Sequence, residues 1–367
     1  MHVPFFELRD FPEGIETAIQ EKVAFTLAEK RFVLGPAVSA FEDEFARYQN
    51  VPHVVGVGNG YDALVLSLKA LGVGKGDKVL LPGNTYIATI NAVQQVGAMP
   101  VLVEPDPESY NLTASGIARA IDKDVKAILP VHLYGQACDM ETIMGIANQV
   151  GLLVVEDCAQ AHGAEVGGKK AGTFGQANAF SFYPTKNLGA YGDAGGVTTH
   201  SEQVADFLRK YRNYGQSERY YYDVVGVNSR LDSLQAAILS VKLAHLDALN
   251  TERQRLAKIY LQELQRVGDL VLPATQAGCG HVYHLFVVRT QRRYALQQYL
   301  QAKGITTLIH YPVPAHLQPS YAHLGLKAGD LPITEELANT SLSLPLFPGM
   351  TEQEQTAVVE AIRQFFA

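Results

Sequence analysis

The sequence is poor in cysteine. Only three cysteines occur among 367 residues, at Cys138, Cys158 and Cys279, and no two of them form a CxxC pair. This number and spacing exclude a CxxC zinc site or redox couple. We therefore expect reduced cysteines that serve mainly in packing.

Positive charge and long apolar runs are also scarce. Lys and Arg number 30 against 37 Asp and Glu, which gives a net charge of -7. Because nucleic-acid binding depends on clustered basic residues, we exclude that class of protein. No apolar run approaches the roughly 18 residues of a transmembrane helix. The N-terminal MHVPFFELRDFPEGIE is acidic where a signal peptide is basic, which predicts a cytoplasmic protein without membrane attachment.

The chain does contain a regular alternation of strand-like and helix-like segments, and it is long enough for two domains. Short β-branched runs alternate with amphipathic stretches, several of which end in glycine. This alternation predicts an α/β fold with a mainly parallel sheet flanked by helices. The expected strands are 53–59, 78–82, 100–105, 127–132, 152–157 and 179–183, and the expected helices between them include 61–72, 87–98 and 139–151.

The pattern changes after Asn228. Leucines from Leu231 to Leu264 are spaced for one helical face, which predicts a long helix that bridges two domains. The segments HVYHLFVVR, HYPVPAHLQP and EQEQTAVVEAIRQFF then predict a smaller α+β unit. We expect a large domain over residues 1–245 and a small C-terminal domain over residues 246–367.

Three motifs that follow predicted strands carry the candidate chemistry, because ligands of open α/β sheets bind at the carboxyl ends of the strands. In GVGNGYDAL, Gly58, Asn59 and Gly60 end a strand and Tyr61 begins a helix, where free N–H groups and the helix dipole favour a phosphate. The segment matches neither GxGxxG nor a P-loop, so a plain strand-to-helix turn remains open.

The second motif, LLVVEDCAQAHGA, places Asp157, Gln160 and His162 at a strand end. A carboxylate buried there is costly unless a positive group meets it. For Asp157 alone, a helix N-cap or an ion pair is the plainer interpretation. For His162 we expect a packing role, because no nearby His or Cys has the spacing of a metal ligand.

The third motif, FSFYPTKNLGAYGDAGG, contains Ser181, Tyr183 and Lys186 and then four glycines, which would permit turns that hold an amine against a flat ligand. A lone lysine is usually a surface residue, but a buried one loses its charge more easily and attacks carbonyls. A phosphate cradle, a carboxylate and an amine together are what pyridoxal 5'-phosphate (PLP) requires. The three motifs therefore predict PLP as the cofactor, held covalently by Lys186.

At these residues the sequence resembles the fold-type I PLP enzymes, and more narrowly the nucleotide-sugar aminotransferases of the DegT/StrS type. The resemblance covers nearly the whole chain. It runs through RFVLGPAVSAFEDEFA, GNGYDAL, PGNTYIATINAV, PVHLYGQACDM, VVEDCAQAHGA, FSFYPTKNLGAYGDAGG, RNYGQ, NSRLDSLQAAIL, HVYHLFVVR and HYPVPAHLQP. It implies the fold of a type I aminotransferase with a large PLP-binding domain.

The resemblance also implies roles for individual residues. Lys186 and Asp157 would be catalytic, with Asp157 paired to the ring nitrogen of PLP, while Gln160 would reach the ring hydroxyl and Tyr86 would stack on the ring. The remaining implied contacts are Gly60, Tyr61, Ser181 and Asn228 for the cofactor phosphate, and Tyr183, Tyr214, His310 and Tyr311 for the sugar nucleotide. The chain departs from many members of the family, which have Thr where it has Tyr61.

In this family the asparagine corresponding to Asn228 reaches the active site of the neighbouring subunit, so the resemblance implies a homodimer with shared sites. No metal is implied, and His281 and His284 are interpreted as the edge of a strand in the small domain.

The motifs VHLYGQACDM and SFYPTKNLGAYGD look most like the branch that acts on a 3-keto sugar. The implied reaction transfers an amino group from L-glutamate to a dTDP-3-keto-6-deoxyhexose and gives a dTDP-3-amino-3,6-dideoxyhexose. A 4-keto sugar aminotransferase of the same family and a non-catalytic PLP-binding regulator stay open. A PLP-dependent dehydratase would lack Lys186, and an NAD-dependent sugar dehydrogenase would need GxGxxG.

Overall fold

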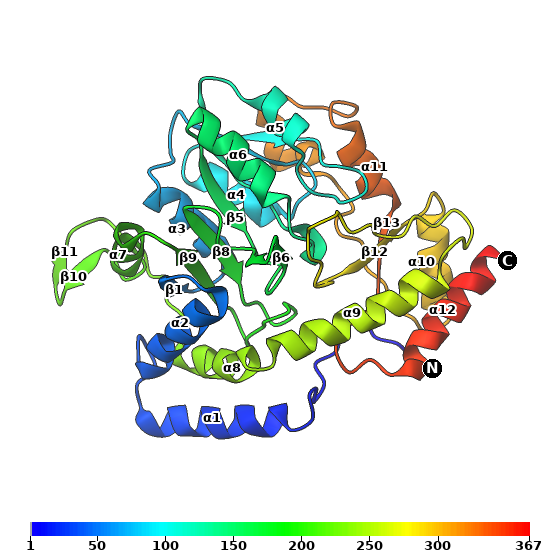
Figure 1. Ribbon diagram of the computed structural model, residues 1–367, viewed down its shortest axis with the longest axis horizontal. Coiled ribbons are helices and arrows are strands. Elements are labelled where there is room, and N and C mark those ends of the chain that lie inside the picture. The colour runs from blue at the N-terminus through cyan, green and yellow to red at the C-terminus, as the bar shows by residue number, and fades with distance from the viewer. Residues whose placement is uncertain (1) are drawn as a thin grey trace.

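A seven-stranded sheet forms the centre of the molecule in the computed structural model, which describes residues 2–367 (Figure 1). Its strand order is β1-β9-β8-β5-β4-β2-β3. All neighbours are parallel except β9, which is antiparallel to both β1 and β8. The predicted mainly parallel sheet is confirmed. The strands are β1 (His53–Val57), β2 (Lys78–Pro82), β3 (Met99–Val103), β4 (Val125–Ile128), β5 (Leu153–Asp157), β8 (Ala177–Ser181) and β9 (Gly195–Thr199).

Strand β9 was not predicted, because Gly195 and Gly196 were interpreted as turn residues. Neither these two glycines nor Gly189 and Gly192 have a positive φ. Their lack of a side chain serves close packing instead: a Cβ at Gly195 would overlap the Asn59 carbonyl group. The prediction of a turn is therefore wrong for Gly195 and Gly196, which lie in β9, and the reason for a glycine at position 195 is steric rather than conformational.

Helices cover the sheet, and their ends follow local sequence signals. Helix α6 begins at Asp139, whose side chain accepts a hydrogen bond from the Thr142 N–H, and it ends at Gly151, which has φ 73°. The helices around the sheet are α2 (Pro36–Gln49), α3 (Gly60–Ala70), α4 (Ile87–Gln95), α5 (Ala114–Ala120), α6 (Met140–Val150) and α7 (Glu202–Tyr211). Helix α1 (Ile15–Glu29) packs instead against the later helix α8 (Ser233–Leu243) (Figure 1). Short strand pairs β6–β7 (Glu165–Val166, Lys169–Lys170) and β10–β11 (Gln216–Glu218, Tyr221–Tyr222) lie outside the sheet.

The single long helix expected between Leu231 and Leu264 is wrong. The chain forms α8 (Ser233–Leu243) and α9 (Leu246–Glu263), with a break at Ala244 and His245. The apolar spacing runs through the break without a Gly or Pro to mark it. Leu239 of α8 and Leu246 at the start of α9 lie in a cluster with β8, whereas Leu256 further along α9 lies in one with β12 and α12.

The C-terminal part forms its own apolar cluster. Strand β12 (Phe286–Arg289) pairs antiparallel with β13 (Ser341–Leu344). The helices of this part are α10 (Arg293–Ala302), α11 (Pro332–Thr340) and α12 (Glu352–Phe366). Three 3-10 turns lie elsewhere in the chain: η1 (Leu133–Gly135), η2 (Ala315–Leu317) and η3 (Pro319–Leu324). The cluster combines Val3 with residues of α9, β12, α10, β13 and α12, whereas Leu337 of α11 packs with the residues of the large sheet. A division into domains near residue 245 stays a prediction.

None of the helices within residues 2–367 combines the length and the apolar character that are needed to cross a bilayer. All three cysteines are unpaired and buried.

Candidate active site

The carboxyl ends of β5 and β8 and the start of α3 meet at one edge of the sheet. Gly60 packs so closely against Ser181 that a Cβ at position 60 would overlap the Ser181 side chain. As the first two residues of α3, Gly60 and Tyr61 have N–H groups without an acceptor inside the helix. This arrangement suits a phosphate. It combines backbone donors, a serine hydroxyl and a position that only glycine fits.

Asp157 ends β5 and is 5% exposed. One of its carboxylate oxygens accepts a hydrogen bond from Thr89 Oγ1 at 2.8 Å, and the other accepts one from the Ala159 N–H at 3.1 Å. Burial raises the pKa of Asp157, whereas these donors and the charge of Lys186 oppose the rise. Asp157 caps no helix and has no ion-pair partner within residues 2–367. Both plainer interpretations of this residue are therefore wrong, and its carboxylate suits a cationic ring nitrogen.

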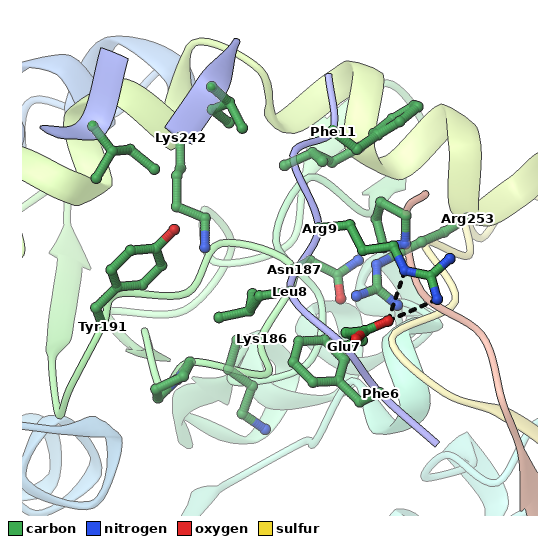
Figure 2. A pocket seen from close by; sticks show the side chains of 15 residues that line it. Phe6, Glu7, Leu8, Arg9, Phe11, Lys186, Asn187, Tyr191, Lys242 and Arg253 are labelled. Carbon is green, nitrogen blue, oxygen red and sulfur yellow. Dashed lines mark hydrogen bonds and ion pairs between the residues drawn. The ribbon is translucent and has the colours of Figure 1, made fainter. Parts of the chain in front are cut away.

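Lys186 lies on the loop after β8, where its N–H donates to the Tyr183 carbonyl at 2.8 Å. Its side chain is half-buried and helps to line a cavity of about 50 Å³ beside the N-terminal segment (Figure 2). Burial lowers the pKa of Lys186 from 10.5 to about 8, although the charge of Asp157 acts in the opposite direction. Lys186 therefore supplies a neutral amine at a lower pH than an ordinary lysine.

The pKa of Lys186 predicts a specific pH dependence of its acetylation. Burial disfavours the charged form, so the reactive neutral amine should appear as the pH rises through about 8. We expect the rate of acetylation at Lys186, followed by peptide mass spectrometry from about pH 6 to about pH 10, to be half-maximal near 8. In the urea-denatured chain, the rate of acetylation at Lys186 should still be rising at the upper end of this pH range. Equal profiles in the two states would contradict the lowered pKa.

Aromatic residues and Gln160 form one wall of the site. The rings of Tyr86 and Tyr311 lie 5.4 Å apart. Gln160 Nε2 donates to the Tyr311 hydroxyl at 3.2 Å, and Gln160 Oε1 accepts from the Tyr134 N–H at 2.7 Å. The Tyr134 hydroxyl donates in turn to the His310 carbonyl. The segment that follows β5 and contains Gln160 is thus connected by hydrogen bonds to the distant segment that contains His310 and Tyr311.

Sequence reasoning assigned no role to Thr89 or Tyr134. Thr89 lies on α4 one turn after Tyr86, and that spacing could have suggested a shared face. Tyr134 stands in the PVHLYGQACDM motif, but its partners are far away in sequence. His162, for which packing was expected, is fully buried between Phe180 and Phe182, with ring centroids 5.5 and 5.7 Å away.

In the part of the chain that the structure describes, two of the implied substrate and cofactor residues, Tyr214 and Asn228, are not hydrogen-bonded to this group. Asn228 Nδ2 donates to the Tyr214 hydroxyl at 3.0 Å, and both residues are exposed beside the β10–β11 pair. Within residues 2–367, no hydrogen bond joins either of them to Asp157, Gln160 or Lys186. Tyr183 is 51% exposed near Lys186, and His310 Nδ1 lies 2.8 Å from Ser343 Oγ.

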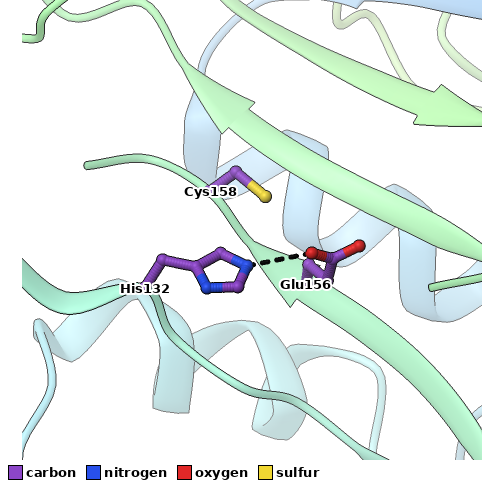
Figure 3. A group of neighbouring side chains, drawn as sticks. All are labelled: His132, Glu156 and Cys158. Atoms are coloured by element: carbon purple, nitrogen blue, oxygen red, sulfur yellow. Dashed lines mark hydrogen bonds and ion pairs between the residues drawn. The ribbon is translucent and has the colours of Figure 1, made fainter. Parts of the chain in front are cut away.

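His132, Glu156 and Cys158 are the one group among the described residues with the composition and spacing of metal ligands (Figure 3). Their ligand atoms are otherwise engaged. Both ring nitrogens of His132 are hydrogen-bonded, at 2.9 Å to Glu156 and 2.9 Å to the Cys138 N–H. Burial raises the pKa of Cys158 to about 12, which favours the thiol over the metal-binding thiolate. The arrangement therefore suits a structural hydrogen-bond cluster.

Known proteins are similar to this chain over nearly its whole length. Residues 13–363 match the model of the DegT/DnrJ/EryC1/StrS aminotransferase family. A "dTDP-3-amino-3,6-dideoxy-alpha-D-galactopyranose transaminase" from Aneurinibacillus thermoaerophilus is 46% identical over 363 residues, which cover 99% of both chains. A "Pleiotropic regulatory protein" from Geobacillus stearothermophilus is 44% identical over 368 residues, which cover 100% of this chain and 99% of that one. The solved structure of DesV from S. venezuelae is similar with a TM-score of 0.97 and 44% identity, covering 99% of this chain and 98% of that one.

Proposed function

Because the chain belongs to the DegT/DnrJ/EryC1/StrS aminotransferase family, we propose that it transfers an amino group from L-glutamate to a nucleotide-linked keto sugar. Its fold is that of the type I aminotransferases, and the chain is an aminotransferase. The observation that carries the proposed reaction is the meeting of Asp157, Lys186 and the Gly60–Ser181 cradle at one sheet edge.

The residues of the site fit PLP. The N–H groups of Gly60 and Tyr61 and the Ser181 hydroxyl would hold the phosphate, while Asp157 would face the ring nitrogen. Lys186 would anchor the cofactor covalently. When bound, PLP acts as an electron sink that makes the proton on the substrate carbon acidic enough to remove.

The residues of the chain then have distinct tasks in transamination. Lys186 Nζ, with a pKa of about 8, would take the proton from Cα of the amino donor and deliver it to the former aldehyde carbon of PLP. The Asp157 carboxylate, held by Thr89 and the Ala159 N–H, would keep the ring nitrogen of the cofactor protonated. Gln160 would reach the ring hydroxyl of PLP and Tyr86 would stack on its ring, so that these two side chains would fix the plane of the cofactor ring.

The acceptor that we propose is a dTDP-3-keto-6-deoxyhexose, and the product is a dTDP-3-amino-3,6-dideoxyhexose. The printed names of several relatives support this choice, since they describe dTDP-3-amino sugar transaminases. Tyr183, Tyr214, His310 and Tyr311 would contact the sugar nucleotide. A 4-keto acceptor remains the alternative. The name of the Geobacillus relative favours a regulator as a second candidate, against which the complete Asp157–Lys186 pair argues.

A spectroscopic titration tests the proposed reaction. PLP is added to the purified protein, then L-glutamate, and then either a dTDP-3-keto-6-deoxyhexose or its 4-keto isomer. We expect a visible band of lysine-bound PLP that fades with glutamate and returns only with the 3-keto sugar. A return only with the 4-keto sugar would move the reaction to C4, and a bound cofactor that glutamate never changes would support the regulator.

We propose further that the active protein is a homodimer whose sites are shared, with Asn228 binding the cofactor phosphate of the partner subunit. Large side chains are exposed on and beside the β10–β11 pair next to Asn228, including Tyr220 at 72%, Tyr221 at 68% and Val225 at 94%. Such a patch favours burial against a second chain.

We also propose a cytoplasmic location, because the three buried cysteines are unpaired.

Mixing two inactive variants distinguishes shared sites from separate ones. Lys186→Ala removes the amine, and Asn228→Ala should weaken cofactor binding by losing a phosphate contact. After subunit exchange, each mixed dimer should regain one intact site, so that about one quarter of all sites become active. Turnover is measured before and after exchange. If mixing restores no activity while exchange is confirmed by native mass spectrometry, Asn228 acts within its own subunit.

A further inference from the structure

His132 and Glu156 form a fully buried pair next to Asp157, the residue that is proposed to contact the ring nitrogen of the cofactor. Glu156 precedes Asp157 on β5, and successive strand residues face opposite sides of a sheet. Asp157 therefore faces the site while Glu156 faces the interior, where both His132 and Glu156 are 0% exposed. Figure 3 shows the two side chains joined beside Cys158.

The Glu156 carboxylate accepts four hydrogen bonds. Oε1 accepts from the N–H groups of Phe174 and Gly175 at 2.8 and 2.9 Å. Oε2 accepts from the Gly172 N–H at 2.8 Å and from His132 Nε2 at 2.9 Å. The loop 172–175 is thereby fixed to β5 through one side chain.

The direction of the His132 contact follows from its second nitrogen. His132 Nδ1 accepts a hydrogen bond from the Cys138 N–H at 2.9 Å, and a backbone N–H can only donate. Nδ1 therefore carries no proton, and Nε2 carries the proton that it donates to Glu156. The pair is a neutral imidazole bound to a carboxylate, with its tautomer set by the backbone.

Backbone contacts connect this pair to Asp157. The His132 N–H donates to the Asp157 carbonyl at 3.1 Å, and the Asp157 N–H donates to the Pro130 carbonyl at 2.9 Å. His132 thus holds β5 twice, through its main chain at Asp157 and through its side chain at Glu156. A shift of either partner would move the Asp157 backbone.

We propose that His132 and Glu156 are positioning residues that set the Asp157 carboxylate against the ring nitrogen of the cofactor. This inference rests on the proposed function, because it assigns the pair a role in the same site. It adds a requirement that the contact with PLP alone does not contain: the carboxyl end of β5 must be held by Glu156, both of whose side-chain oxygens accept hydrogen bonds.

Glu156→Gln tests this requirement with almost no change in volume. The side-chain amide of glutamine contains one acceptor and one donor group. Because donors face both oxygens of Glu156, either orientation of the amide would set its NH₂ group against N–H groups. Glu165→Gln is the matched control, since Glu165 has an exposed side chain near the same loop.

The readout is the dissociation constant of pyridoxamine 5'-phosphate, measured by fluorescence titration, because this form binds without a bond to Lys186. We expect Glu156→Gln to weaken binding about 10-fold and to slow the single-turnover reaction with L-glutamate by at least about 10-fold. In an Asp157→Asn background the same substitution should change either quantity by less than about 3-fold, since the contact that it disturbs is already lost.

If Glu156→Gln reduces cofactor affinity and the single-turnover rate equally in the wild-type and Asp157→Asn backgrounds, the inference is overturned and the pair has only a general structural role. Unchanged cofactor binding by folded Glu156→Gln protein would also overturn the inference. If that variant does not fold, His132→Asn decides: it retains an acceptor for the Cys138 N–H but is too short to donate to Glu156, and the same pattern is expected at smaller size. Failure of the wild-type protein to bind the cofactor at all would instead refute the proposed function.

Discussion

Lys186→Ala should abolish turnover, with a loss of about 10⁴-fold or more. The substitution removes both the covalent anchor of the cofactor and the amine that moves the proton, and each of these tasks has a large effect on rate. The half-buried position of Lys186 and its pKa of about 8 suit that amine for both tasks. The measurement is the steady-state rate with L-glutamate and the keto sugar, together with the visible spectrum after PLP addition.

The control for this variant is Lys169→Ala, which removes an exposed lysine on β7. It should keep the wild-type rate and spectrum. A small primary amine added to the Lys186→Ala protein should restore part of the proton transfer, because the vacated space lies beside the cavity of about 50 Å³. Normal turnover by Lys186→Ala without added amine would rule out the role assigned to this lysine.

Asp157→Asn should lower the catalytic rate by roughly 10²- to 10³-fold while the protein still binds the cofactor. Asparagine retains the shape of aspartate and an acceptor for the Thr89 hydroxyl, but it has no charge to keep a ring nitrogen protonated. The loss should therefore appear in kcat more than in KM for either substrate. Rates with L-glutamate and the keto sugar, measured over a range of each substrate, separate the two parameters.

Asp206→Asn is the matched control, because the Asp206 side chain is 61% exposed and pairs only with Arg209 on the surface. It should behave as the wild type. A rate within a few-fold of wild type for Asp157→Asn would show that the cofactor ring does not depend on this carboxylate, and the assignment of the ring-nitrogen contact would then be wrong.

The two variants probe groups that influence each other electrostatically. The charge of Asp157 raises the pKa of Lys186, and burial of both groups acts against their charged forms. Neutral asparagine at position 157 should consequently leave Lys186 with a still lower pKa. The acetylation profile of Lys186 in the Asp157→Asn protein should shift to lower pH, and a shift to higher pH would contradict this coupling.

Local sequence patterns predicted most of the regular structure. Six strands of the sheet and the last helix, Glu352–Phe366, lie close to their predicted positions, because β-branched runs and apolar spacing act over a few residues. The same local signals failed where packing decided. The break at Ala244 interrupts an unbroken apolar pattern. Gly195 lies in a strand, where the neighbouring Asn59 backbone leaves no room for a side chain.

For the candidate site, too, some features follow from the sequence and others only from the tertiary structure. The sequence by itself determined which chemical groups are available, since Asp157, Lys186 and Gly60 each follow a predicted strand and the motifs around them identify the family. Only the tertiary structure decided what holds those groups. Thr89 donates to Asp157 across 68 positions, Tyr134 to His310 across 176, and His132 to Glu156 across 24. Such contacts depend on how the strands and loops assemble in space, and no periodicity within a single segment encodes them.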